Sequence, residues 1–290
     1  MSVENVLIGT SGWGYDEWVG PFYPRSLKKE DYLLYYSEIF NTNEINTSFY
    51  SIPSRWVVEN WVNKTPSDFL FSAKLPQSIT HQHKLEIKNC LDDLENFLKA
   101  MKPLIKSKKL LAFLIQLPPF FKKEEHFGNL MEFIDNWPGN SKRDNYNLVV
   151  EFRDKSWMVE EVFQFLTEKS LTYCAVIEPL LPPRMDVTNP AFAYIRFHGY
   201  GKKIWFDYCF TEEEIQKWVS PIKEVIQKTD NVGIYFNNHF SGYATKNSLM
   251  LMKELGIHPK NLPEEVRILD IKKKSGEYSK GQIGLDKFIK

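Results

Sequence analysis

The sequence predicts a single closed (β/α)8 barrel of the TIM type. Eight short runs rich in Val, Ile, Leu, Phe and Tyr have the length and composition of strands, and segments with helical spacing of apolar residues lie between most of them. This alternation implies parallel strands joined by right-handed crossovers. Eight such units in 290 residues match the size of one barrel domain. An open, doubly wound sheet is the structural alternative.

Most predicted strands are bounded by Asn, Pro, Gly or Asp, which are typical of the turns that end strands. In chain order the strands are Val6–Thr10, Asn43–Thr47, Phe69–Lys74, Leu110–Leu117, Leu148–Phe152, Leu171–Ile177, Ala191–Phe197 and Val232–Phe236.

Helices are predicted where apolar residues recur every three or four positions. Ser54 has the position of a helix N-cap, and Thr211 with Glu214 forms a capping-box pattern. The predicted helices are Glu30–Phe40, a helix starting after Ser54, Leu85–Met101, Glu124–Trp137, Trp157–Lys169, Thr211–Lys228 and Lys246–Leu255.

Two parts of the chain depart from the repeating pattern. The segment after the sixth strand contains Pro179, Pro182 and Pro183, which exclude a regular helix, so we predict an irregular sixth crossover. The chain ends in the basic sequence KKKSGEYSKGQIGLDKFIK, which is typical of a surface extension. We therefore assign residues 1–259 to the barrel and 260–290 to a short C-terminal appendage.

The composition is that of a globular protein with a sizeable core, with 43% hydrophobic and 26% charged residues. Lys and Arg number 37, as do Asp and Glu, so no global positive charge attracts nucleic acid. The three cysteines are too few and too scattered for a disulfide framework or a zinc ribbon. The N-terminus lacks a signal-peptide pattern, and no apolar run could span a bilayer. We expect a cytoplasmic protein without a membrane partner.

Polar side chains occur at the carboxyl ends of most predicted strands, where TIM barrels hold their active sites. They are Glu44, Asn46, Lys74, Gln116, Glu151, Arg153, Arg196, His198, Tyr235, Asn237 and Asn238.

Strand periodicity puts several of these charges on one face. Glu151 shares a face with Arg153, and Arg196 shares one with His198. Buried charges are very unfavourable alone, so these groups must pair or hold a ligand. One interpretation is structural, with Glu151–Arg153 and Glu44–Arg196 as ion pairs that close the barrel mouth. The other is a binding or catalytic site, which better explains polar residues at six strand ends.

A catalytic interpretation gives the charged residues distinct roles. Glu44 or Glu151 would be the general base, and His198 the general acid, since a histidine pKa can lie near the working pH. The cationic groups of Lys74, Arg153 and Arg196 would neutralise phosphate or developing negative charge. The amides that would orient sugar hydroxyls or a base edge are Asn46, Gln116, Asn237 and Asn238.

The loop after the first strand, GTSGWGYDEWVGPFYP, carries five large aromatic residues. A plain connection does not need so many rings. We expect Trp13, Tyr15 and Trp18 to face the barrel mouth and stack on a sugar or base, and Phe22 and Tyr23 to pack the loop down.

The loops after strands seven and eight are candidate phosphate sites, as in other barrels. Gly199 and Gly201 would let backbone amides approach an anion, and Lys202 and Lys203 would add positive potential beside Asn238. The alternative is a flexible turn with solvated lysines.

A cofactor cannot be named from the sequence, although a divalent metal is one alternative. His81 and His83 form an H-x-H pair, and His198, Glu44 and Glu151 could add ligands. The sequence has no HExxH motif and no paired CxxC motif, so the metal signal is weak.

Several blocks of the sequence resemble the YecE-like family, which is known as domain of unknown function seventy-two. These blocks cover about residues 5 to 256 and are GTSGWGYDEWVGPFYP, NEINTSFYSIP, TPSDFLFSAKLPQSITH, LLAFLIQLPPFF, EFRDKSW, AYIRFHGYG and IYFNNHFSGYATKNS. The resemblance implies a TIM-type barrel but no established reaction. Likeness of this barrel type to endonuclease-IV-like and sugar-isomerase barrels suggests nucleic-acid or phosphosugar ligands, by fold analogy alone.

Three functions follow as hypotheses. The leading one is a cytosolic enzyme acting on a phosphorylated, sugar-containing ligand, such as a nucleotide or nucleic-acid end, by phosphoester hydrolysis or related chemistry. The second is a glycoside hydrolase-like or carbohydrate-binding barrel, although strands four and seven end in Gln116 and Arg196 rather than in carboxylates. The third is a non-catalytic protein that binds a metabolite. The sequence does not determine the oligomeric state.

Overall fold

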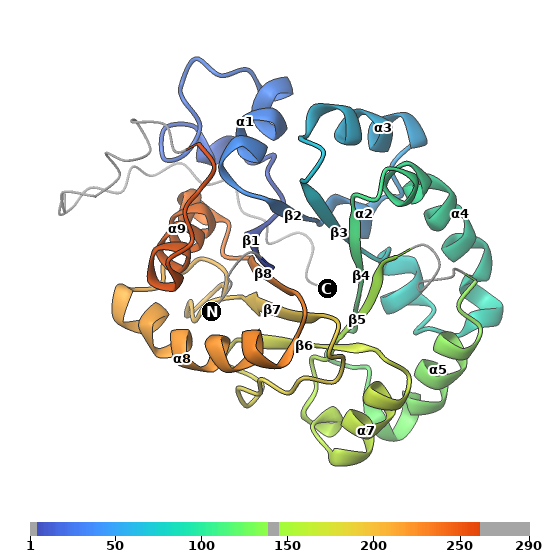
Figure 1. Ribbon diagram of the computed structural model, residues 1–290. Helices are drawn as coiled ribbons and strands as arrows, with labels where there is room; N and C mark the ends of the chain where they lie inside the picture. The colour runs from blue at the N-terminus through green and yellow to red at the C-terminus, as the bar shows by residue number, and fades with distance from the viewer. Residues whose placement is uncertain (1–4, 139–144, 262–290) are drawn as a thin grey trace.

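The computed structural model describes residues 5–138 and 145–261 as a closed barrel of eight parallel strands in chain order (Figure 1). Strand β1 pairs with both β2 and β8, which closes the sheet. The predicted TIM-type (β/α)8 fold is confirmed. The strands are β1 Val6–Ser11, β2 Thr42–Ile45, β3 Leu70–Lys74, β4 Leu110–Gln116, β5 Asn147–Glu151, β6 Thr172–Ile177, β7 Ala193–Phe197 and β8 Val232–Phe236.

Each predicted strand overlaps an observed one, and the differences lie at strand ends. The largest are two residues long: β7 begins at Ala193 rather than at Ala191, and β2 ends at Ile45 rather than at Thr47. Asn46 has helical backbone angles, with φ −90° and ψ −24°, and begins the short helix α2 (Thr47–Tyr50). The apolar and β-branched residues here suggested strand, but the chain turns sharply inside the barrel mouth.

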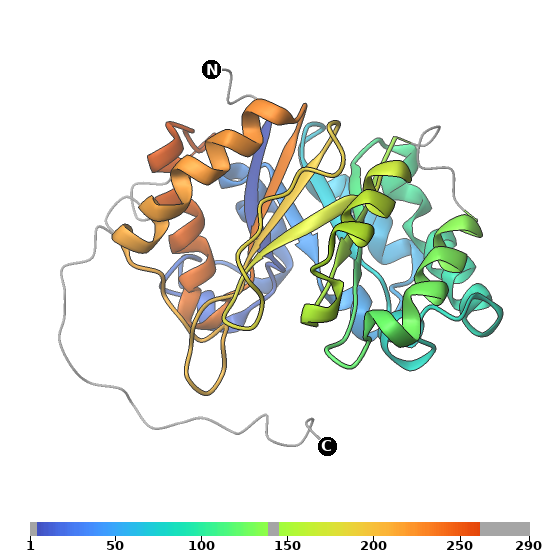
Figure 2. The ribbon, with the colours of Figure 1, turned by 90° about the horizontal axis from the view of Figure 1, so that it is seen from below.

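The helices surround the barrel as an outer layer (Figures 1 and 2). Besides α2, they are α1 Tyr32–Ile39, α3 Arg55–Lys64, α4 Ile87–Lys106, α5 Lys123–Asp135, α7 Glu160–Glu168, α8 Glu212–Lys228 and α9 Tyr243–Leu255. Single turns are η1 Asp16–Trp18, η2 Lys29–Asp31, η3 Ser78–Gln82, η4 Lys155–Trp157 and η5 Phe240–Gly242.

Local sequence signals explain where several helices begin. The Ser54 side chain accepts a hydrogen bond from the Val57 amide, and the Thr211–Glu214 capping box is present at α8. No helix forms between β6 and β7, as the prolines there predicted. Residues 262–290 lie outside the described part, so the proposed division at residue 259 stays a prediction.

Below the carboxyl ends of the strands, the barrel interior is packed and closed. Ala112, Leu114, Val149 and Cys174 fill it together with the stacked rings of Tyr194 and Tyr235. The polar strand ends therefore lie above an apolar plug, not above an open pore. Within residues 5–138 and 145–261, no helix is long and apolar enough to cross a membrane.

Candidate functional site

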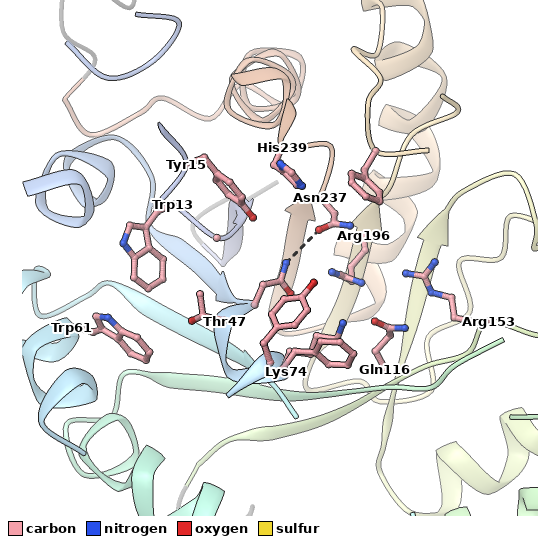
Figure 3. Close-up of a pocket in the computed structure, with 16 residues that line it drawn as sticks. Trp13, Tyr15, Thr47, Trp61, Lys74, Gln116, Arg153, Arg196, Asn237 and His239 are labelled. Atoms are coloured by element: carbon pink, nitrogen blue, oxygen red, sulfur yellow. Dashed lines mark hydrogen bonds between the residues drawn. The ribbon is translucent and has the colours of Figure 1, made fainter. Parts of the chain in front are cut away.

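A pocket of about 510 Å³ opens among the carboxyl ends of the strands (Figure 3). Such a volume lies in the range of small-molecule sites, roughly 300–1,000 Å³. Eight residues predicted for the site line it: Trp13, Tyr15, Asn46, Lys74, Gln116, Arg153, Arg196 and Asn237. Eight further lining residues are Gly12, Gly14, Thr47, Phe49, Tyr50, Trp61, Phe206 and His239.

The pocket wall combines cations and aromatic rings. Among the lining residues that the structure describes, Lys74, Arg153 and Arg196 are cationic and none is Asp or Glu. Figure 3 shows Trp13 and Trp61 on one side of the pocket and Arg153 on the opposite side. The wall therefore presents a positive region beside an apolar, stacking region.

The predicted carboxylates lie beneath this wall and hold the two arginines. Arg196 donates to Glu44 at 2.7 Å and to Glu151 at 2.5 Å, and all three side chains are almost fully buried. Arg153 donates to Glu151 at 2.5 Å and to Glu178 at 2.6 Å. Both ion pairs of the structural interpretation therefore exist, and their guanidinium groups also form part of the pocket wall.

Glu44 and Glu151 are occupied by fixed partners. Glu44 also accepts hydrogen bonds from Ser11 and Tyr194, each at 2.6 Å. Burial alone would raise the pKa of Glu151, but Arg153 and Arg196 hold it well below its usual range. Neither carboxylate faces the pocket, so the geometry does not favour the role of general base that the sequence suggested for them.

His198 lies in the same buried layer. Because guanidinium groups only donate, its Nε2 atom accepts from Arg153 at 3.0 Å, and its Nδ1 atom lies 3.1 Å from the Asn237 amide. Burial, with Arg153 and Arg196 nearby, lowers the pKa of His198 to about 3. The ring is neutral near pH 7, so the expected role of general acid does not fit this environment.

Two rings of the first loop line the pocket. Trp13 packs edge-on against Trp61, with ring centroids 5.6 Å apart, and Tyr15 stacks on His239 at 4.5 Å. Gly12 makes the turn out of β1 with φ +83°, and a Cβ atom there would lie only 2.7 Å from the Tyr15 hydroxyl. The stacking of Tyr15 on His239 joins the loop after β1 to the loop after β8.

The third ring of that loop is not in the pocket, so the prediction for Trp18 is wrong. Trp18 is fully buried, and its Nε1 atom donates to the His239 carbonyl at 2.7 Å. The spacing of η1 turns this side chain inward, where it packs beside Phe22 and Tyr23. The buried positions of Phe22 and Tyr23 confirm that they pack the loop down.

Of the two predicted phosphate loops, the one after β8 reaches the pocket through Asn237 and His239, but the glycine–lysine segment after β7, residues 199–203, does not line it. Lys202 is exposed and does not line it. The Gly201 amide donates to the Trp205 carbonyl, and a Cβ atom on Gly201 would meet the Ile204 carbonyl at 2.0 Å. These glycines serve a tight turn within the loop instead of an anion cradle.

Two further predicted residues have structural partners. The Asn238 amide donates to the Tyr208 carbonyl and to Asn247, each at 2.8 Å. Tyr235 belongs to the barrel interior, where its hydroxyl group lies 2.8 Å from Thr42 and 3.0 Å from Ser72. Both side chains are fully buried and outside the pocket wall. Tyr235 lies one layer lower in the barrel interior, and Asn238 lies behind β8.

The metal hypothesis lacks a donor set among the described residues. No group of three or more His, Cys, Asp or Glu side chains there could hold an ion. His81 instead packs against Phe49, and burial together with nearby Lys74 lowers its pKa to about 4. The part of the chain that the structure describes therefore offers no ligand set for a bound divalent cation.

Several residues that line the pocket were not predicted from the sequence, because they lie in helices and turns and not at strand ends. Phe49 and Tyr50 come from α2, Trp61 from α3, and His239 from the turn before η5. Glu178 was also missed, although it directly follows β6 in the same alternation as Cys174. That alternation was a usable signal, whereas α2 had none because its residues favour strands.

These observations define a class of protein: a (β/α)8 barrel with a pocket at its mouth that basic and aromatic side chains line. The sequence profile described as "Protein of unknown function DUF72" matches residues 7–269. The chain belongs to this family, as its resemblance to YecE-like proteins predicted.

Relatives of this chain are found in several bacteria. The UPF0759 protein YunF of Bacillus subtilis is 28% identical over 279 residues, covering 87% of this chain and 95% of YunF. The UPF0759 protein YecE of Escherichia coli K12 is 33% identical, over 51% of this chain and 48% of YecE. A DUF72 family protein from Thermotoga maritima, known from its crystal structure, is 34% identical in sequence, with a TM-score of 0.78. The match covers 87% of this chain and 99% of the Thermotoga chain. Another DUF72 family protein, from Enterococcus faecalis, is 25% identical with a TM-score of 0.76, covering 89% and 98% of the two chains.

Proposed function

We propose that this protein is a cytosolic enzyme that acts on a small phosphorylated ligand containing a sugar. One observation carries the proposal: the described pocket wall has two arginines, a lysine and aromatic rings, and no carboxylate. Guanidinium groups bind phosphate oxygens through short, charge-assisted hydrogen bonds. Rings such as Trp13 and Trp61 are suited to the face of a sugar or base.

Unpartnered polar atoms support a ligand in this position. The Arg196 Nε atom is a buried donor without an acceptor, and the Asn46 Oδ1 atom is a buried acceptor without a donor. Buried polar groups are nearly always hydrogen-bonded in folded proteins. A ligand that carries both anionic oxygens and hydroxyl groups would satisfy both atoms.

The buried carboxylates help to make this wall rigid. Arg153 and Arg196 are held by Glu44, Glu151 and Glu178, so their guanidinium groups need little reorganisation when an anion binds. Phosphoester hydrolysis would need a proton acceptor that faces the pocket, and Lys74 is the candidate. A glycosidase needs two carboxyl groups that flank the ligand, which the described wall does not provide.

Calorimetric titrations with D-ribose 5-phosphate and with D-ribose test the proposal. We expect the phosphorylated sugar to bind at least about tenfold more tightly, and its affinity to fall as salt rises. Arg153→Gln should abolish this preference, whereas Arg55→Gln, at an exposed arginine of α3, should not change it. Equal affinity for the two sugars, or binding of neither, would overturn the proposal.

A further inference from the structure

Lys74 is a buried lysine without an oxygen partner. It ends β3, is 9% exposed, and lies in the pocket wall. Its Nζ atom sits 3.6 Å from the centre of the Phe49 ring. Within residues 5–138 and 145–261, no carboxylate approaches this amine to within ion-pair distance. An ammonium group in such a place is poorly compensated for its lost hydration.

A second buried lysine shows what structural compensation looks like in this fold. Lys109 is 5% exposed, and its Nζ atom donates to the carbonyl groups of Val62 and Thr65, each at 2.7 Å, and to the Thr65 hydroxyl at 3.0 Å. Three oxygen acceptors therefore hold this ammonium in place. Lys74 has only the aromatic face, so packing stability does not explain its burial.

The buried position of Lys74 favours the neutral form of its side chain. Burial is the main cause, and Arg196 acts in the same direction, so the pKa of Lys74 is lowered to about 7. Arg153 adds to this effect, while Glu151 and Glu44 oppose it from behind the wall. His81 of η3 packs against the same Phe49 ring and is neutral near pH 7, because burial lowers its own pKa to about 4.

A neutral amine in a preformed pocket is a nucleophile. At pH 7 about half of the Lys74 side chains would be unprotonated, against roughly one in 3,000 for a lysine with the ordinary pKa of 10.5. Lysines made reactive by desolvation and by neighbouring cations form Schiff bases with carbonyl substrates. Lys74 has both of these features and faces the space in which a ligand would lie.

We propose that the Lys74 amine forms a Schiff base with the open-chain carbonyl group of an aldose or ketose phosphate at the barrel mouth. This inference rests on the proposed function, because Arg153 and Arg196 would hold the phosphate while Lys74 meets the other end of the sugar. Asn46 and Gln116 line the same pocket, and their amide groups would bind hydroxyl groups of the sugar.

Formation of the Schiff base needs no cofactor. The Nζ lone pair of Lys74 bonds to the carbonyl carbon, and the carbonyl oxygen takes up a proton as the amine loses one, giving a carbinolamine. The carbon–oxygen bond then breaks, and the hydroxyl group leaves as water with the second amine proton. The product is an imine, and its protonated form withdraws electrons from the neighbouring carbon, which is how such lysines activate sugars.

Reductive trapping tests this inference on the full-length protein. D-ribose 5-phosphate is added with sodium borohydride, which reduces an imine to a stable secondary amine, and the adduct is located by peptide mass mapping. We expect one adduct per chain at Lys74, with at least tenfold more label than on any surface lysine. Lys109 should stay unlabelled, which separates reactivity from burial alone.

Variants and a second probe make each outcome decisive. Lys74→Met should lose the adduct, and Lys99→Met, at an exposed lysine of α4, should retain it. Mapping of the wild-type protein locates the adduct even if Lys74→Met fails to fold. Label spread over surface lysines, or no label, would overturn the Schiff base. Ribitol 5-phosphate has no carbonyl group, so if it binds while ribose 5-phosphate leaves no adduct, the inference fails and the proposed function stands.

Discussion

Replacing Glu151 by Gln tests the buried charge layer that supports the pocket. The Glu151 side chain has no exposed surface and accepts from Arg153 and Arg196, each at 2.5 Å. A glutamine of the same shape can accept one of these bonds, but it turns an amide donor toward the other guanidinium. Removing one partner of a buried ion pair destabilises proteins by about 3–5 kcal/mol. We expect a loss near the lower end of this range at pH 7, because Arg153 keeps Glu178 and Arg196 keeps Glu44.

The effect should depend on pH in a defined direction. The folded-state pKa of Glu151 lies well below its usual range, so its stabilising effect is fully present above the unfolded-state pKa of about 4.3. It is lost as pH falls through the lower, folded-state value. The difference in unfolding free energy between wild type and Glu151→Gln should therefore be largest at neutral pH and should shrink below about pH 4.

Urea unfolding, followed by tryptophan fluorescence over this pH range, measures the difference directly. Glu95→Gln is the matched control, because Glu95 forms an exposed pair with Lys99 and should change stability by less than about 0.5 kcal/mol. A loss below about 1 kcal/mol for Glu151→Gln, or one that stays constant on acidification, would refute the account of a tightly coupled ionic layer.

Three further predictions follow from single side chains. Sulfate keeps its charge between pH 6 and 9, whereas Lys74 loses its proton with a pKa of about 7. The affinity of the protein for sulfate should therefore fall by about an order of magnitude over this pH range. Calorimetry should find no such fall in Lys74→Met. Trp13→Ala should weaken ligand binding by roughly 1–3 kcal/mol, whereas Trp18→Ala should lower stability by about 3–5 kcal/mol. Titrations measure the loss of binding and thermal melts the loss of stability. If Trp13→Ala mainly lowered stability and Trp18→Ala mainly weakened binding, the roles assigned to the two residues would be wrong. Thr211→Ala should remove the cap of α8 and about 1 kcal/mol of stability, and an unchanged urea midpoint would contradict this.

The fold could be predicted because it is encoded in local patterns. Strand and helix signals alternate along the chain, and caps such as Ser54 and Thr211 mark where helices begin. The exception is α2, whose β-branched and aromatic residues favour a strand while the structure turns them into a helix. Local propensity is weak enough for the shape of the barrel mouth to override it.

The sequence by itself also determined which polar residues share the inner face of the barrel. Alternation along each strand put Glu151 with Arg153, and Arg196 with His198, and all four belong to one hydrogen-bonded network.

Only the tertiary structure decided which of these groups line the pocket and which lie beneath it. Arg196 and Glu44 are 152 positions apart, and their contact depends on register and on distance across the closed barrel. The same holds for Trp18, which the chain turns inward, and for Lys74, which no carboxylate reaches among the described residues. Sequence spacing specifies a side chain's face, whereas its depth and its partners depend on packing between distant segments.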